Sequence, residues 1–232
     1  VVTVTPKPLI ADQTVSTCRG TAFTVPLTNN PPSIILPTGT NFTWTVSSPA
    51  GITGASNQTP PISTISQTLI NTTNAPIDVV YNVTASSGTA PNNCTSTFTV
   101  TVTVNPKPLI PAQTITKCSG ISFTVTPVNN LPNTVVPSGT SYSWPAPVVA
   151  GITGAAAGSN QTSITGNLTN TSTAPIDVTY IITASSGTAP NNCTSTFNLI
   201  VTVNPSPSVT FSPLPQTICS GDTTALVTLS ST

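Results

Sequence analysis

The chain of 232 residues has very few ionisable side chains: four Lys or Arg, four Asp or Glu, and no His. General acid–base catalysis needs a positioned titratable group, most often His, Glu or Asp, and zinc, copper and iron sites use His or clustered Cys. Calcium sites need several carboxylates close together, but Asp12, Asp78, Asp177 and Asp222 stand singly. We therefore expect no enzyme activity, no cofactor and no metal site.

The sequence also lacks the features of two common partners. Its formal net charge is zero and it has no basic stretch, so the electrostatic footprint of a nucleic-acid-binding protein is missing. Its longest apolar runs are only a few residues, which is too short to cross a bilayer. We expect neither nucleic-acid binding nor direct membrane insertion.

What the chain does contain indicates β-structure. Its 25 Pro and 13 Gly separate stretches rich in Thr, Val, Ile, Ser and Asn, which is the composition of short strands and turns. The signals that start and continue helices are missing. The fold class is predicted to be all-β.

The sequence repeats itself with a period of about 100 residues. Pro6-Lys7-Pro8-Leu9-Ile10 returns at 106–110, Trp44 returns at Trp144, and TASSGTAPNNCTST stands at both 84–97 and 183–196. The predicted domains are 1–4, the end of a preceding repeat; 5–105, the first repeat; 106–204, the second; and 205–232, the start of a third, truncated repeat. We expect the chain to be part of a longer array.

Alternation of apolar and polar residues places the strands within each repeat. Strands are expected near 12–17, 21–27, 40–46, 50–54, 63–70, 77–85 and 95–104. About seven strands, a length near 100 residues and a Trp on a central strand are typical of two antiparallel sheets packed in the immunoglobulin manner. Trp44 and Trp144 are interpreted as core residues.

The five cysteines follow the repeat: Cys18 and Cys94 lie in the first unit, and Cys118 and Cys193 in the second. The predicted disulfides join Cys18 to Cys94 and Cys118 to Cys193, and Cys219 would bond a partner outside this sequence. Disulfides imply an oxidising compartment and hence export. Free buried thiols are the alternative.

Several positions are candidates for glycosylation, which would help a chain with only 3% charged residues stay soluble. Asn-X-Ser/Thr triplets begin at Asn41, Asn57, Asn71, Asn82, Asn93, Asn160, Asn167, Asn170 and Asn192, and Thr223 follows an Asp in a short O-glycosylation-like motif.

The segments PKPLI, FTWTVSSPAGITG, LTNTSTAPIDVTYIITASSGTAPNNC and TFTVTVTVNPKP resemble the PKD-like tandem repeats of large surface adhesins of gliding Bacteroidota. The resemblance implies tandem immunoglobulin-like (PKD-like) β-sandwich domains arranged head to tail. It also implies export by the type IX route, display on the outer cell surface, and service as the stalk or body of an adhesin, which includes the motility adhesins.

Two other functions remain open at this stage. The domains could be subunits of a self-assembling extracellular filament, with lateral copies of the chain as partners, or an array of carbohydrate-binding modules that bind surface polysaccharide. In the stalk reading, the partners are neighbouring repeats of the same long chain. Lys7 and Lys107, with Asp78 and Asp177, also recur in register, which raises an isopeptide cross-link as a minor alternative to solvated charges.

Overall fold

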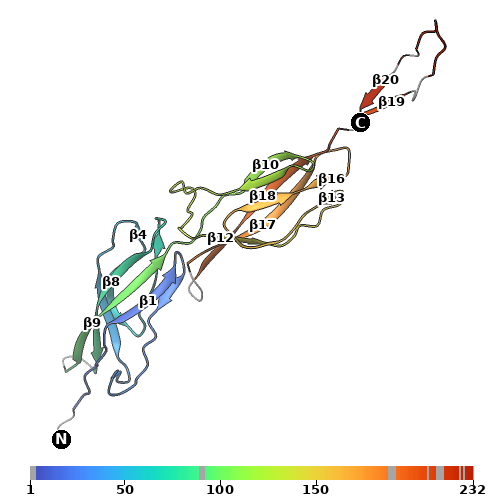
Figure 1. Cartoon of the computed structure of the whole chain (residues 1–232). Helices are drawn as coiled ribbons and strands as arrows, with labels where there is room; N and C mark the ends of the chain where they lie inside the picture. Colours follow the sequence, from blue (N-terminus) through green and yellow to red (C-terminus); the bar gives the residue numbers. More distant parts are fainter. Residues whose placement is uncertain are drawn as a thin grey trace. The chain divides into compact units, whose positions relative to one another are not determined.

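The computed structural model describes residues 4–88, 92–187, 192–207, 209–212, 217–224, 226 and 228–231, and their regular elements are all β-strands (Figure 1). The all-β fold class is confirmed. The chain forms two compact units, the first made of 1–111, 127–141 and 183–196, and the second of 112–126, 142–182 and 197–232. The boundaries drawn from the repeat remain predictions.

The described residues of the first repeat form nine strands. They are β1 (Gln13–Cys18), β2 (Ala22–Thr24), β3 (Asn41–Val46), β4 (Ile52–Thr53), β5 (Gln58–Ile62), β6 (Ser66–Thr68), β7 (Ile70–Asn71), β8 (Ile77–Ser87) and β9 (Cys94–Asn105). A five-stranded sheet has the order β1-β9-β8-β3-β5, while β2 pairs with β6 and β4 with β7. All these pairs are antiparallel except β1 with β9, which is parallel.

The second repeat has the same strand order. Its strands are β10 (Gln113–Cys118), β11 (Ser122–Val125), β12 (Ser141–Trp144), β13 (Ile152–Thr153), β14 (Gly158–Gln161), β15 (Ile164–Asn167), β16 (Thr169–Asn170), β17 (Ile176–Ser186) and β18 (Cys193–Asn204). They form a sheet β10-β18-β17-β12-β14 and the pairs β11-β15 and β13-β16. A last hairpin pairs β19 (Val209–Ser212) with β20 (Thr228–Ser231).

Each core forms because the long strands alternate strictly. Along β8 from Val79 and along β9 from Phe98, every second residue is buried, and the residues between them are half-buried or exposed. In the first repeat the Tyr81 ring packs against Phe23, with ring centroids 5.5 Å apart, and edge-on against Trp44 at 6.3 Å. Trp44 and Trp144 are buried, as expected. The aromatic residues therefore fill the space between the two β-layers.

The last glycine of the repeated GITG motif lies close to the backbone of a neighbouring segment. Gly54 adopts φ +89°, and a Cβ atom there would lie 2.4 Å from the carbonyl oxygen of Thr68. Gly154 has the same conformation against Asn167. Only glycine fits this position without displacing backbone.

The strands agree with the predicted ones at most positions, with one omission. β5 contains Pro60 and Pro61, which argue against a strand in the sequence, and it was not predicted. The structure places β5 at the edge of its sheet, where a strand tolerates Pro because no neighbour needs its missing N–H on the outer side. The predicted turn between β8 and β9 lies partly outside the described residues, at 89–91.

Candidate functional site

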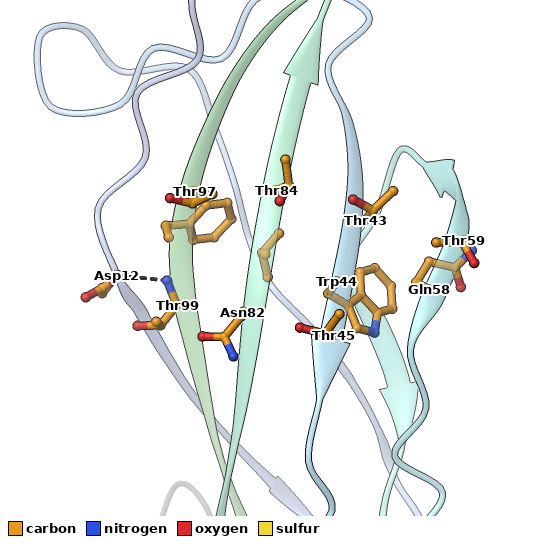
Figure 2. Close-up of a pocket in the computed structure, with 12 residues that line it drawn as sticks. Asp12, Thr43, Trp44, Thr45, Gln58, Thr59, Asn82, Thr84, Thr97 and Thr99 are labelled. Carbon is orange, nitrogen blue, oxygen red and sulfur yellow. Dashed lines mark hydrogen bonds between the residues drawn. The ribbon is translucent and has the colours of Figure 1, made fainter.

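One hollow of the first repeat lies on the outward face of its five-stranded sheet (Figure 2). It has a volume of about 430 Å³, and side chains from β3, β5, β8 and β9 line it. Hydroxyl and amide groups form two rows across the strands. The pairing places Thr43, Thr84 and Thr97 in one row, and Thr45, Asn82 and Thr99 in the other.

Among the described residues that line this hollow, Asp12 alone is charged. Its carboxylate accepts a hydrogen bond from the backbone N–H of Thr99 at 2.7 Å (Figure 2). That bond favours the charged form and therefore lowers the pKa of Asp12. The carboxylate is thus a fixed part of the sheet edge, and it is engaged with the backbone.

The chemistry of this hollow is not conserved in the second repeat. At the matching positions Ala112 replaces Asp12, Pro145 replaces Thr45, and Ile181 replaces Asn82. Sequence analysis missed the site, although the outward threonines were visible as the polar positions of alternating strands. A function that every repeat shares cannot depend on this surface.

The cysteines form a different bond from the predicted ones. Cys18 is joined to Cys193, with 5.6 Å between their Cα atoms and a sequence separation of 175. Both residues belong to the first compact unit. Cys94, Cys118 and Cys219 are free thiols in this chain. The predicted pairs Cys18 with Cys94 and Cys118 with Cys193 are therefore wrong.

The strand register explains why the two cysteines of one repeat do not pair. Cys18 is level with Asn105 at the end of β9, whereas Cys94 begins β9, eleven residues away. Eleven residues of strand span about 36 Å, while a disulfide needs Cα atoms within about 7 Å of each other. Cys118 is level with Asn204, at the opposite end of β18 from Cys193. Within one repeat, the two cysteines cannot meet.

Two of the glycosylation candidates are buried structural residues. The Asn71 side chain donates to the carbonyls of Ala75 (2.7 Å) and Val104 (2.8 Å), and its Oδ1 accepts from the backbone N–H (2.8 Å) and the hydroxyl (2.7 Å) of Thr73. Asn170 makes the matching bonds in the second repeat. Both amide hydrogens are used inside the core, so the folded domain leaves no room for a glycan at either residue.

The remaining candidates are exposed and stay predictions. They are Asn41, Asn57, Asn82, Asn93, Asn160, Asn167, Asn192 and Thr223.

Comparison with known proteins identifies the family. A model of the PKD-like domain matches residues 16–108 and again residues 115–207. The chain belongs to the PKD-like family. Its two full repeats are tandem PKD-like domains with an immunoglobulin-like β-sandwich fold. No curated protein matches the chain.

Comparison with solved structures finds only distant similarity to this chain. One is the protocadherin gamma B2 extracellular cadherin domains 1–5, at 12% identity and TM-score 0.27, which covers 98% of this chain and 46% of that one. Another is the N-terminal four Ig domains of Dscam1 isoform 1.9, at 13% and 0.27, covering 100% and 60%. A SusE-like surface located polysaccharide binding protein from Bacteroides thetaiotaomicron has 8% and 0.33, covering 83% and 32%. The chain spans less than two thirds of the length of each of these proteins.

Asp78 and Asp177 recur at matching positions of the two PKD-like domains, and each has a threonine partner. Asp78 is exposed and accepts a hydrogen bond from the hydroxyl of Thr103, and Asp177 does the same with Thr202, both at 2.6 Å. Their carboxylates thus have hydroxyl partners across the strands.

No group of three His, Cys, Asp or Glu in the part of the chain that the structure describes is placed to hold a metal ion. The same part contains no helix with the length and apolar character that a membrane crossing requires.

Proposed function

We propose that this chain is a non-enzymatic, extracellular repeat region that serves as the stalk or body of a large surface adhesin. The observation that supports it most directly is the Cys18–Cys193 disulfide in a chain of tandem PKD-like domains. Such bonds form and persist in oxidising compartments. The disulfide also connects a cysteine of one repeat to a cysteine of the next, which is useful in a protein that transmits load along its length.

The finer part of the proposal is that the adhesin is of the type exported by the type IX route to the outer surface of gliding Bacteroidota. The repeated sequence motifs support this context. Tandem domains without a shared ligand site fit a spacer better than an array of identical receptors. Three polar residues of the hollow beside Asp12 are replaced by apolar ones in the second repeat, and the indoles of Trp44 and Trp144 are only 2% and 5% exposed.

Surface labelling of the native cell tests the location. Antibodies raised against this chain should bind intact cells, and protease added outside should remove the signal while a cytoplasmic marker is spared. Labelling that appears only after lysis would overturn the proposal. A strain that lacks the type IX translocon should retain the protein inside, and normal display in that strain would refute the export route.

Sedimentation velocity and a glycan array separate the stalk from the other two functions. A spacer should sediment as a monomer over a wide concentration range and should bind no glycan on the array. Reversible polymers would instead establish the filament subunit, which needs large lateral contacts. A saturable glycan signal that Thr84→Val and Asn82→Leu remove would establish a carbohydrate module at the hollow beside Asp12.

A further inference from the structure

The two repeats hold the cysteine at the end of the first strand in the same way. Cys18 is the ladder partner of Asn105, and Cys118 is the ladder partner of Asn204. The backbone N–H after each cysteine donates to the carbonyl of that Asn, at 2.9 Å in the first repeat and 2.8 Å in the second. This cysteine is therefore fixed beside the last residue of its own repeat's final strand.

The cysteine that begins the final strand is fixed beside the incoming chain. The Sγ atom of Cys94 lies 3.4 Å from the carbonyl oxygen of Thr5, and the nearby Ser87 hydroxyl donates to the carbonyl of Pro6 at 2.7 Å. In the second repeat the Ser186 hydroxyl donates to Pro106 in the same way, at 3.0 Å. A shift of 100 residues carries Thr5 onto Asn105.

These two geometries meet at one residue of each repeat junction. The residue that ends a final strand has the first-strand cysteine of its own repeat beside it. The same residue also contacts the final-strand cysteine of the repeat that follows. At the junction present in this chain, those two cysteines are Cys18 and Cys193, and they are bonded.

We propose that Cys94 and Cys118 form the same bond with neighbouring PKD-like repeats of the protein. Cys94 would bond the first-strand cysteine of the repeat before it, and Cys118 the final-strand cysteine of the repeat after it. Cys219 is followed by the same turn as Cys118, since the N–H of Asp222 donates to its carbonyl as that of Ile121 does to Cys118, both at 3.1 Å. The array then carries one disulfide across each junction, in place of one inside each domain. The proposal depends on the proposed function only for the existence of further repeats.

Each new bond is an oxidation of two thiols. The two sulfur atoms lose two protons and two electrons, and a disulfide oxidant such as oxidised glutathione takes them up and becomes two thiols. The exposure of Cys118 leaves it accessible to such an oxidant and to a partner cysteine.

A lengthened chain tests the proposal without reference to cell location. It consists of residues 1–204, a second copy of 106–204, and then 205–232, so that the new junction joins Asn204 to Pro106, as Asn105 is joined to Pro106 in the original chain. It holds seven cysteines, the five of this chain and two from the added copy. After refolding with oxidised glutathione, N-ethylmaleimide blocks free thiols in denaturant, and intact mass counts the adducts.

The proposal predicts two disulfides and three free thiols in the lengthened chain, and one disulfide and three free thiols in the original. Bonds within repeats would leave one free thiol in either chain and would overturn it. A lengthened chain with one disulfide and five free thiols would overturn it as well. Circular dichroism after refolding verifies that each chain is folded.

Single substitutions identify the cysteine that makes the new bond. Cys118→Ser in the first copy should remove one disulfide and leave four free thiols. Cys94→Ser, the matched control, should keep both disulfides and leave two free thiols. Loss of a disulfide in the Cys94→Ser chain, or its retention in the Cys118→Ser chain, would refute the assignment.

Discussion

The disulfide between Cys18 and Cys193 should make most of this chain inextensible under load. When the chain is pulled from its two ends, only the seventeen residues before Cys18 and the thirty-nine after Cys193 can straighten. The enclosed segment, with a sequence separation of 175 between its ends, contains almost all of both PKD-like domains. At about 3.4 Å per extended residue, the disulfide withholds about 600 Å of contour length.

Single-molecule force spectroscopy measures this length directly. In oxidising buffer we expect only short extensions, from the start of the first domain and from the end of the second. Reductant, or Cys18→Ser, should release the full 600 Å or so in two main events, one for each domain. In the chain-entropy model a closed loop of this size also stabilises the folded chain by about 5 kcal/mol, which the same variant would lose.

The control is Cys94→Ser, because Cys94 is free in this chain. Its force curves should match those of the unaltered chain in both buffers. Cross-links within each repeat would give a different result, since Cys18→Ser or Cys94→Ser would then release only about 260 Å from a loop of some 76 residues. A release of that size from Cys94→Ser would refute the connectivity.

Three further predictions concern the cores. Tyr81→Phe should lower the free energy of unfolding by about 1 kcal/mol, because the Tyr81 hydroxyl donates to Gln67 at 3.0 Å. Tyr180→Phe should instead raise it by about 1 kcal/mol, because the buried Tyr180 hydroxyl has no partner among the described residues. Urea unfolding measures both changes. Asn71→Ala should cost about 3 kcal/mol in the same assay, since it leaves a buried carbonyl unpaired, and exposed Asn82→Ala should change it by less than about 0.5 kcal/mol. Burial raises the pKa of Tyr81 from 10.0 to about 12, so the unfolded state loses its proton first and stability should fall as pH rises across that range, a dependence that Tyr81→Phe should reduce. An unchanged pH profile in Tyr81→Phe would contradict that assignment.

Much of the fold could be predicted because the long strands carry their pattern in the sequence. The alternation of β8 and β9 identified which side chains face the core, and Trp44 could be placed inside from its position on a central strand. The edge strand β5 could not be predicted, because Pro60 and Pro61 oppose a strand locally and only its position at the sheet edge permits one.

The disulfide was mispredicted for a reason that lies in the sheet. The repeat showed which cysteines are equivalent, and it invited pairing within each unit. The parallel pairing of β1 with β9 is a contact between distant segments, and it alone places Cys18 beside Asn105 rather than near Cys94. The burial of Asn71 could not be predicted either. The Asn-Thr-Thr triplet matches the sequence of an exposed glycosylation acceptor, and only the fold turns the Asn71 side chain toward the carbonyl of Val104.

The junction disulfides would determine which part of an array carries tension. With the proposed bonds in place, force that enters at Cys94 can leave at Cys118 after only 24 residues, which comprise β9, the Pro-Lys-Pro linker and β10. Fully extended, that path is about 80 Å long. The other strands of the domain lie off this covalent path, so they could unfold without lengthening it. The sandwich would then act mainly to hold the load-bearing strands and to bring each pair of cysteines together, and this role asks for the same architecture in every repeat and for no shared ligand site.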